Sequence, residues 1–345
     1  MRDPAPNEVA VIITIDTEGD DLWSRPRDIT TRNAKYLPRF QELCTRFKFK
    51  PVYLTNYEMA MSGDFVEFGR DVIAHDAGEI GMHLHAWNSP PLEPLTSDDF
   101  FHHPYLIEYP EGVMRDKIKT LTDLLEDRFD RKMLSHRAGR WAFDDRYAAL
   151  LLEQGYRVDC SVTPGVDWSR NPGHPAGVGG SDYTASPKRP YFLDPTVRCS
   201  KSAKTTNGTL LEVPMTIHAS ALYRNAQWVY QVPLLRRFAN RAAPGLGWLC
   251  PVQPALRAPA QRNLDAMLQV ARALRTDGPT YMEFMLHSSE LMPGGSPTFR
   301  SDSDIERLYE SLEALFEDLS TWCVGMTLAE FRERFGQGLK AEVFA

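Results

Sequence analysis

The stretch VAVIITIDTEGD (residues 9–20) decides the fold class. Its first part is rich in Val and Ile, and Asp16 and Glu18 follow where this apolar run ends. A short apolar run of this kind is typical of a strand buried on both faces, as in a parallel sheet covered by helices. Because alternate residues of a strand face the same way, we expect the two carboxylates to point into one space.

Similar runs recur along the chain and alternate with amphipathic stretches, the pattern of β/α units around a parallel sheet. At 345 residues the chain has the length of one α/β barrel, so we predict a single domain over 1–345. The predicted strands cover 9–16, 51–56, 79–85, 132–138, 156–162 and 281–287. The predicted helices lie near 33–47, 65–77, 112–129, 144–154, 260–275 and 303–319.

The regular alternation breaks between about 165 and 278. This segment holds glycine- and proline-rich pieces such as GHPAGVGGSD and PVQPALRAPA, with a strand-like LLEVPMTIH at 210–218. We predict that about 169–278 form a long insertion between two barrel strands. Such loops often shape substrate specificity.

Composition excludes several classes of function. A net charge of −7 without a basic run argues against nucleic-acid binding. The five cysteines form no CxxC pair, which favours buried thiols in a reducing compartment. The N-terminal MRDPAPNEVAVIIT lacks a signal-peptide pattern, and no stretch approaches ~18 consecutive apolar residues. We therefore expect a cytoplasmic protein without a membrane span.

The third predicted strand ends in GMHLHAWNSPP (81–91), with His83 and His85 on one face. The pair predicts either a metal site or two polar residues on a solvated strand face. Neutral imidazoles suit Zn and similar divalent ions. A carboxylate from another strand end, such as Glu18, would complete a three-ligand site with a position left for water.

Two further strand ends carry candidate side chains. SHRAGRW (135–141) brings Arg137 and Arg140, and FMLHSSEL (284–291) brings His287. An arginine can hold a carboxylate ionised, and a histidine suits a general acid. Each of these residues has an ordinary alternative, such as a surface arginine or a hydrogen-bonded imidazole near the core. However, they share the position where barrels carry active sites, which favours one shared site.

The chain resembles the NodB-homology polysaccharide deacetylases, carbohydrate esterase family four, over about residues 8–335. The resemblance lies in five motifs that stand in the order found in that family: TIDTE, EIGMHLH, RAGRW, VDW (166–168) and MLHS. The resemblance implies a distorted (β/α)7 barrel with the long insertion before its last catalytic strand. It also implies metal-dependent hydrolysis of an acetamido group on a sugar. An N-acetylated sugar or glycan intermediate would then be the partner.

The resemblance also implies roles for residues matched by position. Asp16 matches the catalytic base, and Arg137 matches the arginine that orients this base. His287 matches the general acid, and Asp167 matches the aspartate that tunes the acid.

The same match places a divalent metal on Glu18 and His83, with Zn as our first choice and Co, Ni or Mn as alternatives. The family's second metal histidine lies four residues after the first, where this chain has Trp87. His85 is the predicted substitute, because it shares a strand face with His83. Four residues are predicted to contact substrate: Trp87, Trp141, Trp168 and Leu286.

Three other readings stay open. An amidohydrolase acting on a small cyclic amide or imide would use the same catalytic parts, although its HxH pair normally closes the first strand. A metal-free glycan-binding barrel would account for Trp87. A two-carboxylate glycosidase is disfavoured because Asp16 and Glu18 lie too close to flank a glycosidic bond at the usual ~5 Å or more.

Overall fold

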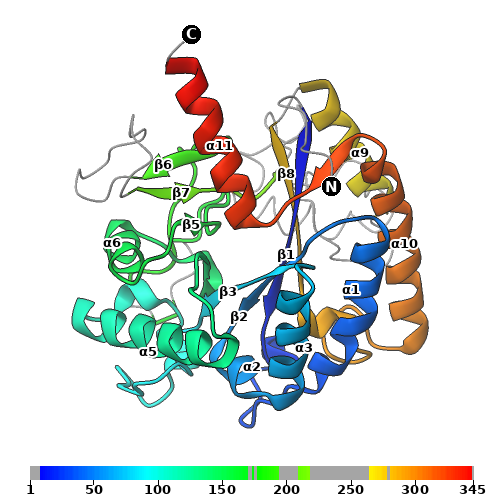
Figure 1. The fold of residues 1–345 in the computed structure, drawn as a ribbon. Coiled ribbons are helices and arrows are strands. Elements are labelled where there is room, and N and C mark those ends of the chain that lie inside the picture. The colour runs from blue at the N-terminus through cyan, green and yellow to red at the C-terminus, as the bar shows by residue number, and fades with distance from the viewer. Residues whose placement is uncertain are drawn as a thin grey trace, which may run out of the picture.

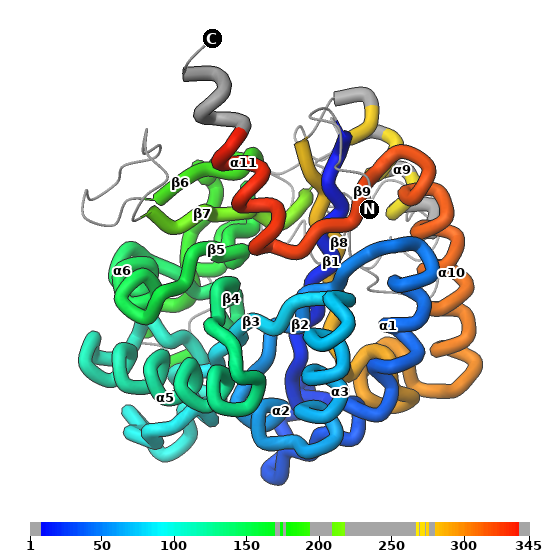
Figure 2. Tube along the Cα trace, in the orientation of Figure 1, coloured from blue at the N-terminus to red at the C-terminus, as the bar shows by residue number. Residues whose placement is uncertain are grey.

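The computed structural model describes residues 8–169, 173–174, 177–193, 209–217, 264–277 and 280–343. Their strands form one curled sheet in the order β6-β7-β5-β4-β3-β2-β1-β8, with β9 added beside β1 (Figure 2). All neighbouring strands are parallel except β6 and β7. The strands are β1 Val9–Thr17, β2 Val52–Thr55, β3 Glu79–Leu84, β4 Ser135–Ala138, β5 Val158–Asp159, β6 Tyr191–Leu193, β7 Leu210–Glu212, β8 Tyr281–His287 and β9 Cys323–Gly325.

Helices surround this sheet, with α1, α3, α5, α6 and α10 on its outside (Figure 1). The α-helices are α1 Leu37–Arg46, α2 Tyr57–Met61, α3 Gly63–Ala74, α4 Asp99–His102, α5 Glu111–Phe129, α6 Asp145–Glu153, α9 Leu264–Asp277, α10 Asp302–Ser320 and α11 Leu328–Val343. Short 3-10 turns cover η1 Leu22–Ser24, η2 Arg32–Tyr36, η3 Leu106–Glu108, η4 Gly139–Trp141 and η5 Ser288–Leu291. No helix in the described part of the chain is long and apolar enough to cross a lipid bilayer.

Strand alternation divides the core into two apolar layers. Val11, Ile13 and Ile15 of β1 belong to the larger cluster, which includes the buried faces of α1 and α10. Ala10 and Ile12 belong to a smaller cluster on the other face of the sheet. Asp16 continues this second set, so the side chain at the carboxyl end of β1 points to the inner face.

The structure confirms the predicted α/β barrel as a curled, mostly parallel sheet covered by helices. The predicted strand 156–162 is wrong in length, since β5 covers Val158–Asp159 only. Beyond it the Ser161 backbone N–H donates to the Asp159 carboxylate, and such local bonds replace a strand ladder. The segment 169–278 contributes β6 and β7 to the sheet, and only β7 falls within a predicted strand-like stretch.

Candidate active site

The carboxyl ends of β1, β3, β4 and β8 meet around one pocket of about 320 Å³, and Ala138 at the end of β4 lines it. Asp16 and Glu18 come from the end of β1, and His83 and His85 from the end of β3. His287 ends β8. Strand alternation turns all these side chains to the inner face, and together they line the pocket.

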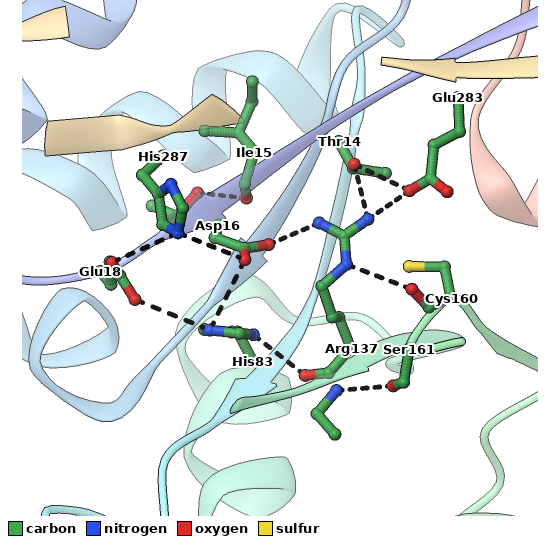
Figure 3. A network of polar contacts seen from close by, with 12 residues as sticks. Thr14, Ile15, Asp16, Glu18, His83, Arg137, Cys160, Ser161, Glu283 and His287 are labelled. Carbon is green, nitrogen blue, oxygen red and sulfur yellow. Dashed lines mark hydrogen bonds and ion pairs between the residues drawn. The ribbon is translucent and has the colours of Figure 1, made fainter. Parts of the chain in front are cut away.

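Arg137 of β4 lies beneath this pocket and is fully buried. Its Nη1 donates to Asp16 Oδ1 at 2.6 Å, and its Nη2 donates to Thr14 Oγ1 at 2.7 Å (Figure 3). Nη2 also bonds to the buried Glu283 carboxylate, and Nε donates to the Cys160 carbonyl at 3.3 Å. One guanidinium group therefore joins two carboxylates, with four of its five N–H donors directed to acceptors.

The two carboxyl groups that share Arg137 have pKa values shifted in opposite directions. Burial alone would raise the pKa of Asp16. The opposing effect of Arg137, His83 and His287 is larger, so the pKa of Asp16 lies well below its usual range. Burial raises the pKa of Glu283 to about 7, against the lowering effect of Arg137 and Thr14. Asp16, which lines the pocket, is thus held as a carboxylate.

Glu18, His83 and His85 form a group that could hold a metal ion. One ligand atom from each lies within 4.8 Å of the others, and all three residues are buried. His83 Nδ1 bonds to the Arg137 carbonyl at 3.0 Å, which leaves Nε2 facing the carboxylates. The pKa of His85 is lowered well below its usual value by burial and by nearby His83. A carboxylate and two imidazoles whose Nε2 atoms face it, at 3.7 and 3.4 Å, fit a divalent ion such as zinc.

Aromatic rings hold His85 in place. Its ring stacks on Trp87 at 4.3 Å between centroids, and Trp87 stacks on Phe100 at 4.3 Å. On another side Gly139 lies so close that a Cβ there would be 2.3 Å from His85 Cδ2. Trp87, at the position of the family's second metal histidine, therefore supports the histidine that the sequence predicted as its substitute.

His287 is held by a residue that the sequence analysis missed. Glu290 accepts a hydrogen bond from the His287 backbone N–H at 2.8 Å, and its carboxylate lies 3.2 Å from His287 Nδ1. Trp23 meets the His287 ring edge-on at 4.9 Å. Asp167, predicted to tune His287, accepts hydrogen bonds from the backbone N–H and hydroxyl of Ser169 and forms an isolated β-bridge with Asp182.

The pocket also collects most of the predicted substrate contacts. Trp87, Trp141 and Trp168 line it. Leu286 lies instead in the apolar core at 1% exposure, because it alternates with His287 and faces the helices. Arg140, named above as a candidate at a strand end, also lines the pocket. Three further aromatic lining residues gave no sequence signal for a site: Trp23, Phe100 and Tyr105.

No protein-family model matches the chain, and no curated protein sequence matches it. Solved structures do. A proposed polysaccharide deacetylase from Mycobacterium smegmatis is 15% identical, with a TM-score of 0.52 over 99% of this chain and 93% of the other. A proposed glycoside hydrolase/deacetylase from Parabacteroides distasonis is 9% identical, with a TM-score of 0.60 over 96% and 72%.

A 4-alpha-glucanotransferase from Thermococcus litoralis is 13% identical and has a TM-score of 0.50. The alignment covers 94% of this chain but 39% of that enzyme. At these identities the comparisons concern the fold. The parallel sheet, its curl and the site at the carboxyl strand ends agree with that likeness. The protein therefore has the fold of the NodB-type polysaccharide deacetylases.

Proposed function

We propose that the protein hydrolyses the acetamido group of an N-acetylated sugar or glycan intermediate and uses one divalent metal ion. The arrangement around Asp16 carries this proposal. One oxygen of its carboxylate binds Arg137 at 2.6 Å, and the other lies 3.8 Å from Nε2 of both His83 and His287. An ionised base and a histidine thus face one small space beside a three-ligand donor set, as metal-assisted amide hydrolysis requires.

The reaction adds water across the amide C–N bond, so acetate and a free amine leave. Asp16 takes a proton from the attacking water, because Arg137 keeps its carboxylate ionised and fixed in direction. His287 delivers a proton from Nε2 to the departing amine, because Glu290 holds Nδ1. A divalent ion held by Glu18, His83 and His85 would supply Lewis-acid polarisation of the carbonyl.

The lining supports a sugar as the substrate. Six aromatic side chains border the pocket, and flat rings offer apolar faces with few rotatable bonds. The likeness of fold to proteins described as deacetylases agrees with this assignment. These aromatic residues are Trp23, Trp87, Phe100, Tyr105, Trp141 and Trp168.

The likeness to a glucanotransferase raises a glycosidic alternative. Two catalytic carboxylates of a glycosidase flank the scissile bond. Here Asp16 and Glu18 converge instead, at 3.8 and 3.7 Å from the same Nε2 of His83. This convergence suits a cation between them better than a sugar linkage.

The test measures acetate release by proton NMR from N-acetylglucosamine and its β-1,4 oligomers. Chelator-treated protein is compared with the same protein resupplied with Zn, Co, Ni or Mn. We expect metal-dependent release, reduced roughly 10²- to 10⁴-fold in Asp16→Asn and in His287→Ala. Arg115→Met is the matched control, because Arg115 sits in an exposed ion pair with Glu153. Full activity in both site variants would refute the proposal, and sugar binding without release would favour the glycan-binding alternative.

A further inference from the structure

Arg140 lines the same pocket, and its surroundings differ from those of three arginines that form ion pairs elsewhere on the surface. Arg39, Arg46 and Arg115 each pair with a glutamate at 3.0 Å or less. Within the part of the chain that the structure describes, no carboxylate lies within ion-pair distance of Arg140, whose side chain is exposed to the pocket and lies over the Trp87 ring at 5.9 Å. An unpaired guanidinium at a binding pocket of an acidic chain is placed to meet an anion.

The backbone directs this side chain to the pocket at a conformational cost. Arg140 has φ 60° and ψ 21°, and the next residue, Trp141, also has φ 60°. Two consecutive residues with side chains in the left-handed region are uncommon, and such strain gathers at functional sites. Gly139 lets the turn press against His85, since a Cβ there would lie 2.5 Å from the Leu84 carbonyl. Arg140 is therefore fixed beside the donor set.

A second arginine reinforces the positive charge at this mouth. Arg25 lies over the Phe101 ring at 4.4 Å and over the Phe100 ring at 5.8 Å, and Phe100 lines the pocket. Burial and the nearby Arg25 lower the pKa of Arg140, against the raising effect of Tyr105 and Glu18. The two arginines are thus close enough to repel each other, and an anion beside them would relieve that repulsion.

We propose that the substrate of this pocket is an N-acetylated sugar carrying an anionic substituent, a phosphate or a carboxylate, which Arg140 binds with support from Arg25. This inference rests on the proposed function, since it names the class of acetylated sugar. A volume of about 320 Å³ lies at the small end of ligand pockets, so the charge belongs to the sugar unit in the pocket or to its immediate substituent. Planar guanidinium recognises both anions through paired N–H donors.

The test is equilibrium binding, followed by quenching of intrinsic tryptophan fluorescence. The probes are N-acetylglucosamine, its 1-phosphate, its 6-phosphate and N-acetylmuramic acid, with inorganic phosphate alone as a fifth. We expect the best anionic sugar to bind roughly 10- to 100-fold more tightly than N-acetylglucosamine, with the ratio falling as salt is added. The phosphate and carboxylate arms identify which anion the site prefers.

The variants separate charge from folding. Arg140→Asn removes the charge with a residue that tolerates the left-handed region, and we expect the anionic preference to fall to about two-fold while neutral-sugar binding is kept. Arg140→Lys should retain part of the preference, and Arg25→Met should lose part of it. Arg115→Met is the control and should bind as the wild type does.

Three outcomes overturn the inference. They are equal binding of neutral and anionic sugars by the wild type, an unchanged ratio in Arg140→Asn, and free phosphate binding as tightly as the sugar phosphates. The proposed function fails separately. Arg140-dependent binding without acetate release from any sugar would refute hydrolysis and leave the anion site standing. Acetate release from neutral sugars, with no preference for anionic ones, would support hydrolysis and refute the anion site.

Discussion

Arg137 and His85 lie at the carboxyl ends of the neighbouring strands β4 and β3, and both are buried, at 0% and 5% exposure. Hydrogen bonds to charged or polar partners hold Arg137 on several sides. His85 depends on contacts of shape. Its Nδ1 has no hydrogen-bond partner among the described residues, its ring stacks on Trp87, and its Nε2 lies 3.4 Å from Glu18 Oε2.

The difference shows how one site can divide two tasks. A buried network of charges fixes the Asp16 base, because any misplaced partner would leave an unpaired charge in the interior. Stacked rings fix the His85 ring plane and leave its nitrogens uncommitted, as a ligand requires. Changes of charge should therefore act most strongly on the Arg137 side, and changes of shape on the His85 side.

The largest expected effect follows from Arg137→Met. This change leaves the Asp16 and Glu283 carboxylates buried without their shared cation, and we expect a loss of about 3–5 kcal/mol in the free energy of unfolding. Urea denaturation measures it. The control Arg115→Met removes an exposed, solvent-screened pair and should change the free energy of unfolding far less. A loss in Arg137→Met as small as in the control would show that the network does not hold the site.

The next effect is on the pH dependence of stability, through Glu283. Its pKa is raised from 4.5 to about 7, so the folded state holds this proton more firmly than the unfolded chain does. The resulting stabilisation is complete below pH 4.5 and is lost as the pH rises to about 7. Arg137, Thr14, Asp16 and Asp159 all act on this group.

Glu283→Gln removes this titration and keeps an amide oxygen for Arg137. The unfolding free energy of the wild type should therefore fall by roughly 2–3 kcal/mol relative to that of the variant as the pH rises from 4.5 to 7. Chemical denaturation across that range gives the difference curve. Parallel curves would mean that Glu283 is ionised throughout this range. Arg137 would then stabilise the Glu283 carboxylate as strongly as it stabilises that of Asp16.

The strand that carries Glu283 shows which features of the site could be predicted from the sequence. The strand YMEFMLH and its terminal His287 were predictable from pattern, and so was the meeting of strand ends from β1, β3, β4 and β8. A lone glutamate within an apolar strand signals that some buried cation exists. It does not name Arg137, because the pairing depends on strand order, and β4 and β8 lie on opposite sides of β1 in the sheet.

The contacts that aromatic and acidic loop residues make around the site could not be predicted from the sequence. Asp167 was matched by its place beside Trp168, and it accepts a hydrogen bond from the Ser169 backbone N–H that the sequence did not indicate. Phe100 belongs to a helix of one turn, and nothing in its neighbourhood predicts a stack on Trp87. Loop conformation depends on tertiary contacts between distant residues, and these leave no period in the sequence.

A smaller effect tests the shape side of the comparison. Trp87→Leu removes the ring that holds His85, and we expect zinc affinity to fall roughly ten-fold as the ligand loses its fixed orientation. Competition with a chromophoric chelator measures this. Trp168→Leu is the matched control, because that ring lines the same pocket but donates to Thr163 and has no ring contact with His85. Equal losses in both variants would assign the effect to the pocket as a whole.

The smallest effect concerns Glu290 and decides between two partners for His287. Glu290→Gln keeps a hydrogen-bond acceptor for the His287 backbone but removes the negative charge beside Nδ1, so an imidazolium formed during the reaction is less stabilised. We expect kcat for acetate release to fall roughly three- to ten-fold with KM nearly unchanged, since the ring stays in place. Asp167→Asn alters a residue that accepts a hydrogen bond from Ser169, and we expect it to leave kcat close to that of wild type. The reverse result would restore the sequence-based assignment, because a charge that moves kcat must act on the group that transfers the proton.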